Sequence, residues 1–145
     1  MTPSISAWLY DFFITPAAEV PITMAWLRAF VCTQAVEVPV YVALIRASIR
    51  SGHCGRPRGV ALQILLAFGA SAITHPMVWF VIPRIPSSSF VEYAVRAEAF
   101  AVCVEAFYFY SLHIVYLRRA LVWSLLANGA SVVAGEALRA LFGWP

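Results

Sequence analysis

Four long apolar stretches, separated by short polar breaks, dominate the chain. Mostly nonpolar residues occupy 22–49, 60–82, 89–117 and 120–142, and proline, glycine or arginine residues lie between them. A helix of about twenty apolar residues is long enough to cross a bilayer. The pattern predicts an all-α protein, an integral membrane four-helix transmembrane bundle that forms a single domain over residues 1–145.

A shorter amphipathic segment precedes the first of these spans. Apolar residues recur within 5–14 at the spacing of one helical face, and Pro16 and Pro21 separate this segment from the first span. The segment is too short to cross a bilayer, and its tryptophan and phenylalanines suit a helix that lies in the membrane interface. We therefore expect a short N-terminal interfacial helix. Its apolar face would consist of Ile5, Trp8, Leu9, Phe12 and Phe13.

Each span also carries polar residues at helical spacing. Glu98 and Glu105 are seven residues apart in the third span, which is two helical turns, so both face the same side. An ionisable residue inside a membrane helix is costly and indicates a functional site. The other spans carry matching polar stripes: Thr33, Glu37 and Tyr41; Ser71 and His75; Ser124, Asn128 and Ser131. We predict one interior site that binds a metal ion or a proton through Glu37, His75, Glu98 and Glu105, with Tyr41, Asn128 and Ser131 as supporting polar residues.

Composition and charge agree with a membrane protein. The chain of 145 residues is 62% hydrophobic and only 12% charged, whereas soluble domains carry about 25% charged residues. The net charge of +3 comes from arginines, which gather in the loops, and not from a surface for nucleic acid. Cytoplasmic loops are the arginine-rich ones, and arginines concentrate in 46–58 and at 118–119. We expect a multi-pass protein of the bacterial inner (cytoplasmic) membrane with both termini outside the cytoplasm.

Three local features refine the spans. Pro39 and Pro76 lie inside the first and second spans, where proline removes a backbone hydrogen bond and favours a kink. Ser89 followed by Glu92 matches the capping box that begins a helix. Opposite charges at helical spacing predict two ion pairs, Glu92 with Arg96 and Glu136 with Arg139.

Three classes of function remain open from the sequence. Carboxylates with imidazole suit iron, manganese or zinc, and helical bundles build such sites in their cores. A divalent metal there would make a metal-dependent intramembrane enzyme acting on a lipid or peptide. Without a metal, carboxylates and a histidine mark proton or cation pathways in transporters. A third class is a non-catalytic membrane subunit or scaffold whose polar stripe binds a partner's helices.

The placement of Glu37 midway along the first of four spans resembles small multidrug-resistance transporters in architecture. The chain is longer than those transporters, and His75, Glu98 and Glu105 depart from their pattern. Transport of an ion or small molecule is the preferred interpretation, because burying three carboxylates is too costly for a scaffold that serine, threonine or asparagine could build. Whether the protein is an enzyme stays open. Expected partners are membrane lipids and further copies or a larger membrane complex, without nucleic acid.

Overall fold

The computed structural model describes residues 21–53 and 59–143. In these residues the chain forms four α-helices and one short 3₁₀-helix, with the bounds α2 Ile22–Arg50, α3 Val60–Phe80, η2 Ile82–Arg84, α4 Phe90–Ser111 and α5 Leu117–Phe142. The expected interfacial helix at 5–14 lies outside the described residues, so it stays a prediction.

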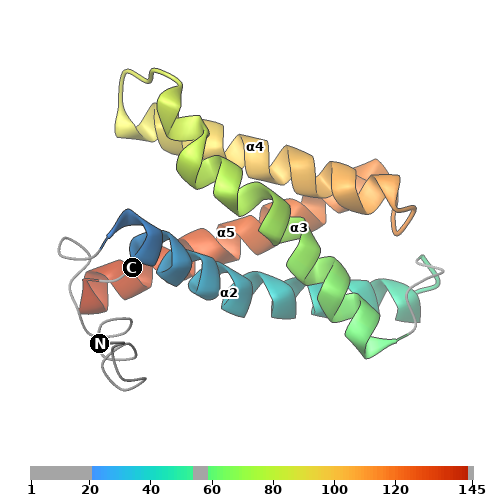
Figure 1. Ribbon diagram of the computed structural model, residues 1–145. Coiled ribbons are helices and arrows are strands. Elements are labelled where there is room, and N and C mark those ends of the chain that lie inside the picture. The colour runs from blue at the N-terminus through green and yellow to red at the C-terminus, as the bar shows by residue number, and fades with distance from the viewer. Residues whose placement is uncertain (1–20, 54–58, 144–145) are drawn as a thin grey trace, which may run out of the picture.

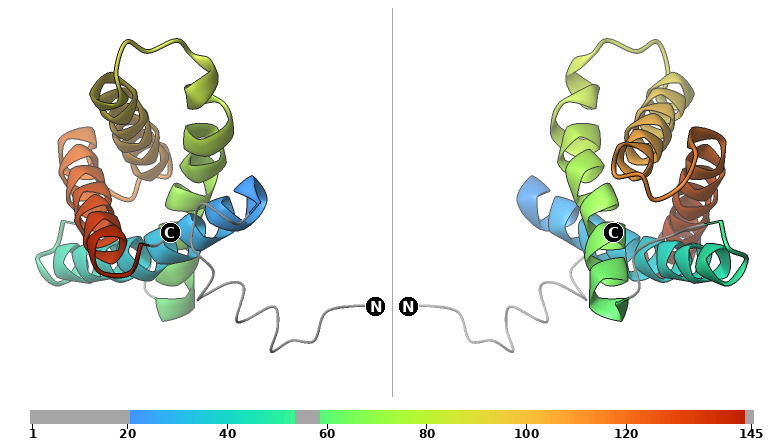
Figure 2. Two further views of the ribbon diagram at one scale, coloured as in Figure 1. Left: turned by 90° about the vertical axis from the view of Figure 1, so that its left-hand side faces the viewer. Right: turned by 90° about the vertical axis from the view of Figure 1, so that its right-hand side faces the viewer.

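The helices form an up-and-down bundle in which consecutive helices are neighbours (Figure 1). Helix α2 packs against α3 and α5, and α4 packs against the same two helices. Helix α4 lies beside α5, while α2 and α3 slant relative to that pair (Figure 2). The beginning of α2 and the end of α5 lie at the same end of the bundle (Figure 1). The predicted all-α four-helix bundle is confirmed.

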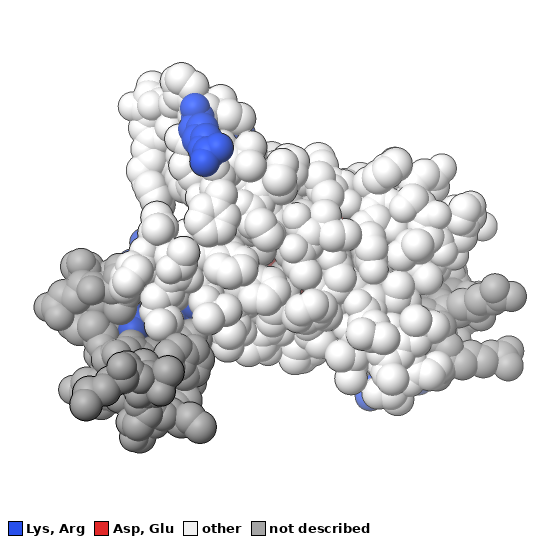
Figure 3. All heavy atoms as spheres, in the orientation of Figure 1, with Lys and Arg blue, Asp and Glu red and all other residues white. Residues whose placement is uncertain are grey.

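Three of the helices are long and apolar enough to cross a membrane: Ile22–Arg50, Val60–Arg84 and Leu117–Phe142. The helix that is not among them, α4, carries Glu92, Arg96, Glu98 and Glu105 within its 22 residues. Blue arginine atoms lie toward the ends of the face seen in Figure 3, and uncharged atoms cover nearly all of the surface between them. By helix length and hydropathy the chain is a multi-pass membrane protein.

The interior and the surface have the composition expected in lipid. Many large apolar side chains are exposed, among them Leu65, Phe107 and Leu125. The buried faces instead consist largely of alanine and polar residues, with a few aromatic side chains such as Phe109. Small residues allow helices to approach closely in lipid, where no hydrophobic force drives them together. The polar stripes therefore face a closely packed interior.

The turn between α4 and α5 corrects the predicted boundary of the last two spans. Helix α4 ends at Ser111, and α5 begins at Leu117, so the arginines at 118–119 lie in the first turn of α5. The amide of Ile114 donates to the carbonyl of Phe109, and that of His113 to Tyr110, while His113 has a φ of 54°. This is a Schellman ending, which usually has glycine at the left-handed position. The sequence gives little sign of it because histidine occupies that position.

The predicted cap and ion pairs are present, with one difference. The amide of Glu92 donates to Ser89 Oγ at 3.2 Å, as in a capping box, but the Glu92 carboxylate accepts from the amide and hydroxyl of Ser88. Arg96 Nη2 lies 2.6 Å from Glu92 Oε1. At the end of α5, Arg139 Nη1 lies 3.4 Å from Glu136 Oε1. Helices α2 and α3 both continue through their prolines, and the kinks there stay predictions.

A close approach of a described glycine to a neighbouring helix, between α3 and α4, gives a first prediction. Among the described glycines, only Gly69 has a neighbour within 4 Å of an added Cβ, which would lie 2.8 Å from Tyr108 Oη. We expect Gly69→Ala to cost about 1 kcal/mol more in the wild-type background than beside Tyr108→Phe, because the hydroxyl must move only when it is present. A double-mutant cycle of unfolding free energies in detergent measures this. Equal effects in both backgrounds would contradict the contact.

Candidate functional site

Glu105 is the centre of a buried hydrogen-bond network. Its Oε2 accepts from Tyr41 Oη at 2.5 Å, from Asn128 Nδ2 at 2.6 Å and from Ser124 Oγ at 3.1 Å. Its Oε1 accepts from Thr74 Oγ1 at 2.9 Å. The side chain of Glu105 is 1% exposed. A buried carboxylate of this kind is tolerated only because both oxygens are bonded.

The four donors come from the three other helices. Tyr41 lies on α2, Thr74 on α3, and Ser124 and Asn128 are one turn apart on α5. The second hydrogen of the Asn128 amide goes to the carbonyl of Ser124 at 3.0 Å. Hydrogen bonds from one carboxyl group to every other helix fix how the helices are arranged around α4. Glu105 is therefore a structural residue that connects all four helices in the interior of the bundle.

Glu37 is buried to the same degree but is bonded on one side only. Ser131 Oγ lies 2.7 Å from Glu37 Oε1 and 2.9 Å from the carbonyl of Asn128, so its single hydrogen is shared between these acceptors. Among the described residues, none makes a hydrogen bond to the buried Oε2 of Glu37. Asn128 thus lies between the two carboxyl groups. Its side-chain NH2 donates to Glu105, and its backbone carbonyl accepts from Ser131, which also donates to Glu37. Within the described residues, the two carboxyl groups therefore differ in how many hydrogen bonds they accept.

His75 is held mainly by aromatic rings. Its ring centroid lies 5.2 Å from that of Phe30 and 6.1 Å from those of Trp26 and Trp79. Its side chain is buried, and no described residue makes a hydrogen bond to its Nδ1. The imidazole therefore sits in an apolar, aromatic surrounding between α2 and α3.

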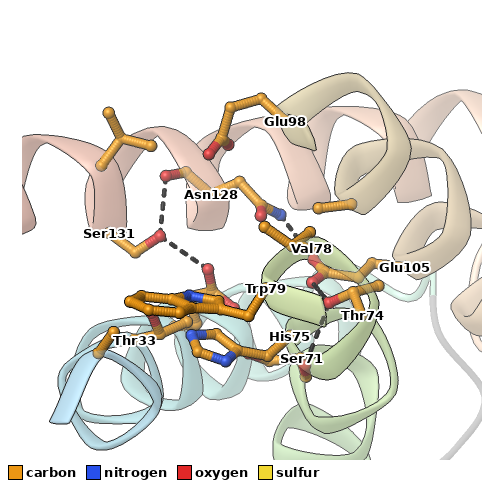
Figure 4. A pocket seen from close by; sticks show the side chains of 14 residues that line it. Thr33, Ser71, Thr74, His75, Val78, Trp79, Glu98, Glu105, Asn128 and Ser131 are labelled. Atoms are coloured by element: carbon orange, nitrogen blue, oxygen red, sulfur yellow. Dashed lines mark hydrogen bonds between the residues drawn. The ribbon is translucent and has the colours of Figure 1, made fainter. Parts of the chain in front are cut away.

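A cavity of about 150 Å³ joins these groups. The Glu98 side chain extends toward it from α4, opposite the rings of His75 and Trp79 (Figure 4). This volume holds several water molecules or one small organic molecule. The lining consists of Ala29, Thr33, Glu37, Ser71, Thr74, His75, Val78, Trp79, Glu98, Ala101, Glu105, Asn128, Ser131 and Val132.

The structure brings the predicted site residues together around this cavity and the adjoining network. Glu37, His75, Glu98, Glu105, Asn128 and Ser131 line the cavity, and Tyr41 reaches it through its bond to Glu105. Thr74 and Ser124 were missed as side-chain donors, because threonine and serine in helices commonly bond their own backbone. Thr74 does this as well, with its hydroxyl 3.1 Å from the carbonyl of Ser71. The position of Ser124 one turn before Asn128 was the signal available for it.

The metal-binding interpretation finds no support in this geometry. In the part of the chain that the structure describes, no three histidine, cysteine, aspartate or glutamate side chains are grouped so that they could hold one metal ion. A tetrahedral or octahedral site needs such donors around one point. A metal bound by Glu37, His75, Glu98 and Glu105 stays a prediction.

Comparisons with known proteins add no assignment to this site. No protein-family model, no curated protein and no solved structure matches the chain.

Proposed function

We propose that this chain is a polytopic membrane protein that binds a proton at Glu37, beside the cavity that Glu98 and His75 also line, and that this site serves transport of an ion or small molecule. The observation that carries the proposal is that only one of the two carboxyl oxygens of Glu37 accepts a hydrogen bond from a described residue. One oxygen is bonded by Ser131, while the other is buried and accepts from no described residue. Such a group is costly to leave as it is and gains most from a bound cation.

The proton is favoured over a metal because it makes the smaller demand on the site. A single carboxyl oxygen binds a proton, whereas a divalent metal needs several donors that converge on one point. The surrounding groups can pass a proton on, because Glu98, His75 and Glu105 line the same cavity and Ser131 lies between Glu37 and Asn128. Chains of carboxylates and histidines of this kind are typical of proton pathways in membrane transporters.

The two carboxyl groups have different roles in this proposal. Glu105 is bonded by four donors and holds the bundle together. Among the described residues, Glu37 has one donor at hydrogen-bond distance, Ser131, and we assign the exchange of a proton to its other oxygen. A scaffold would have no use for an unsatisfied carboxyl oxygen, and a metal-dependent enzyme would need a donor set that the described residues do not assemble. These contrasts favour the transport interpretation.

Infrared difference spectroscopy of the protein in lipid nanodiscs tests the site directly. We expect a carboxylic-acid C=O band that appears as the pH is lowered and that is absent from Glu37→Gln. Glu98→Gln serves as the matched control on the other side of the cavity and should keep that band. Identical difference spectra for the wild type and Glu37→Gln would contradict proton binding at Glu37.

A liposome assay tests the second half of the proposal. Vesicles that contain the protein and a pH-sensitive dye are given a potassium diffusion potential, with protein-free vesicles as the control. Protein-dependent proton entry, or proton movement driven by gradients of sodium or potassium, is the expected result. A scaffold role predicts no difference between the two kinds of vesicle, even where the infrared band is present.

A further inference from the structure

A second polar feature shares no lining residue with the cavity and lies at the end of the bundle where α2 ends and α5 begins. A groove of about 640 Å³ runs there between these two helices. We call it the basic groove, and its lining is Leu44, His53, Tyr116, Arg118, Arg119, Val122 and Trp123. Its walls are polar and cationic on the side of the turn and apolar toward the middle of the bundle.

In the part of the chain that the structure describes, no acidic residue lines the basic groove to neutralise its arginines. Two arginines occupy the first turn of α5, where the helix dipole is already positive and favours anions. That turn contains no acidic residue, and no side chain caps the helix. The described carboxylates lie elsewhere: Glu37, Glu98 and Glu105 line the central cavity, and Glu92 and Glu136 are paired with arginines near the opposite end. An anion would complement the charge of these two arginines.

The apolar part of the groove decides which anion fits. Val122 is 54% exposed and lies on α5 one turn beyond the arginines, and Leu44 and Trp123 continue the same apolar surface. Free phosphate would leave this surface uncovered. A phospholipid fits both parts, with its phosphate at Arg118 and Arg119 and an acyl chain along Val122 and Leu44. Basic pockets between membrane helices bind anionic headgroups in this way.

We propose that the basic groove binds one anionic phospholipid, with its phosphate held by Arg118 and Arg119. Tyr116 is 84% exposed beside these residues, at the depth where tyrosine commonly meets the headgroup layer. The bound lipid would link the end of α2 to the beginning of α5. This site is independent of the central cavity, so the proton-binding proposal stands or falls separately.

Thermal unfolding of the protein in detergent with added lipid tests the proposal. A ligand that binds only the folded state raises Tm. We expect dioleoylphosphatidylglycerol to raise Tm by about 3–6 °C more than dioleoylphosphatidylcholine does. Glycerol 3-phosphate at the same concentration should have no such effect. Equal shifts with the two lipids, or a full shift with glycerol 3-phosphate, would overturn the proposal.

Variants locate the effect. Arg118→Gln with Arg119→Gln should abolish the difference between the two lipids, whereas Arg84→Gln with Arg139→Gln, toward the other end of the bundle, should preserve it. Val122→Trp keeps both arginines but fills the apolar part of the groove, so it should also abolish the difference between the two lipids. This variant tests the groove even if the double glutamine variant does not fold. The assignment would be overturned if the difference between the two lipids survived Val122→Trp. It would also be overturned if Arg84→Gln with Arg139→Gln abolished that difference as fully as Arg118→Gln with Arg119→Gln.

Discussion

Replacing Glu105 by alanine lowers the free energy of unfolding by about 2–4 kcal/mol, the largest loss of stability that we expect from any polar substitution in this chain. Tyr41, Thr74, Ser124 and Asn128 would all lose their common acceptor. A hydrogen bond between membrane helices contributes about 0.6 kcal/mol on average, and a buried donor left unsatisfied costs about 1–3 kcal/mol. Unfolding of the purified protein by denaturant titration in mixed micelles measures the change.

Glu105→Gln is the matched control for this substitution. Three of the four donors converge on Oε2, so a glutamine whose carbonyl oxygen takes that place keeps them. Its amide nitrogen would then replace Oε1 and face the hydroxyl of Thr74, which can accept instead of donate. We expect glutamine to cost less than half as much as alanine. Equal losses for the two variants would mean that charge, and not the hydrogen-bond pattern, stabilises the bundle.

Replacing Glu37 by glutamine should abolish function and preserve the fold, whereas replacing Glu105 by alanine should destabilise the fold. The glutamine oxygen can still accept from Ser131, and its amide would take the place of Oε2, which accepts from no described residue. We expect stability to change by about 1 kcal/mol or less, because one buried polar atom without a partner replaces another. Proton binding at this position should be lost, because the side-chain amide of glutamine has no group that takes up a proton near neutral pH.

Proton movement in the liposome assay measures this second prediction, beside unfolding of the same preparations. Glu37→Gln should reduce the protein-dependent rate by at least roughly tenfold, with the free energy of unfolding changed by about 1 kcal/mol or less. Glu98→Gln, which removes a carboxylate that is only partly buried, should have the smaller effect. A Glu37→Gln variant that is stable and fully active would remove the basis of the proposed function.

The sequence by itself determined the class of the protein and the faces of its helices. Apolar length and arginine placement predict membrane helices because the bilayer is thicker than most soluble helices are long. The spacing of Glu37 and Tyr41, or of Ser124 and Asn128, determines which side of each helix is polar, since helical geometry is local. Because exposing polar side chains to lipid is costly, the sequence also predicted that these polar stripes face one another inside the bundle.

The different states of the two central carboxylates were decided only by the tertiary structure. Glu37 and Glu105 look alike in sequence, because each is an acidic residue within a mostly apolar stretch. Their hydrogen bonds depend on how four helices are rotated and offset against one another, because the partners are 19 to 94 residues away along the chain. The same holds for the end of α4, where His113 takes a conformation that usually requires glycine while Phe109 and Ile114 are buried. Local sequence preferences cannot encode such choices, since packing outweighs them by several kcal/mol.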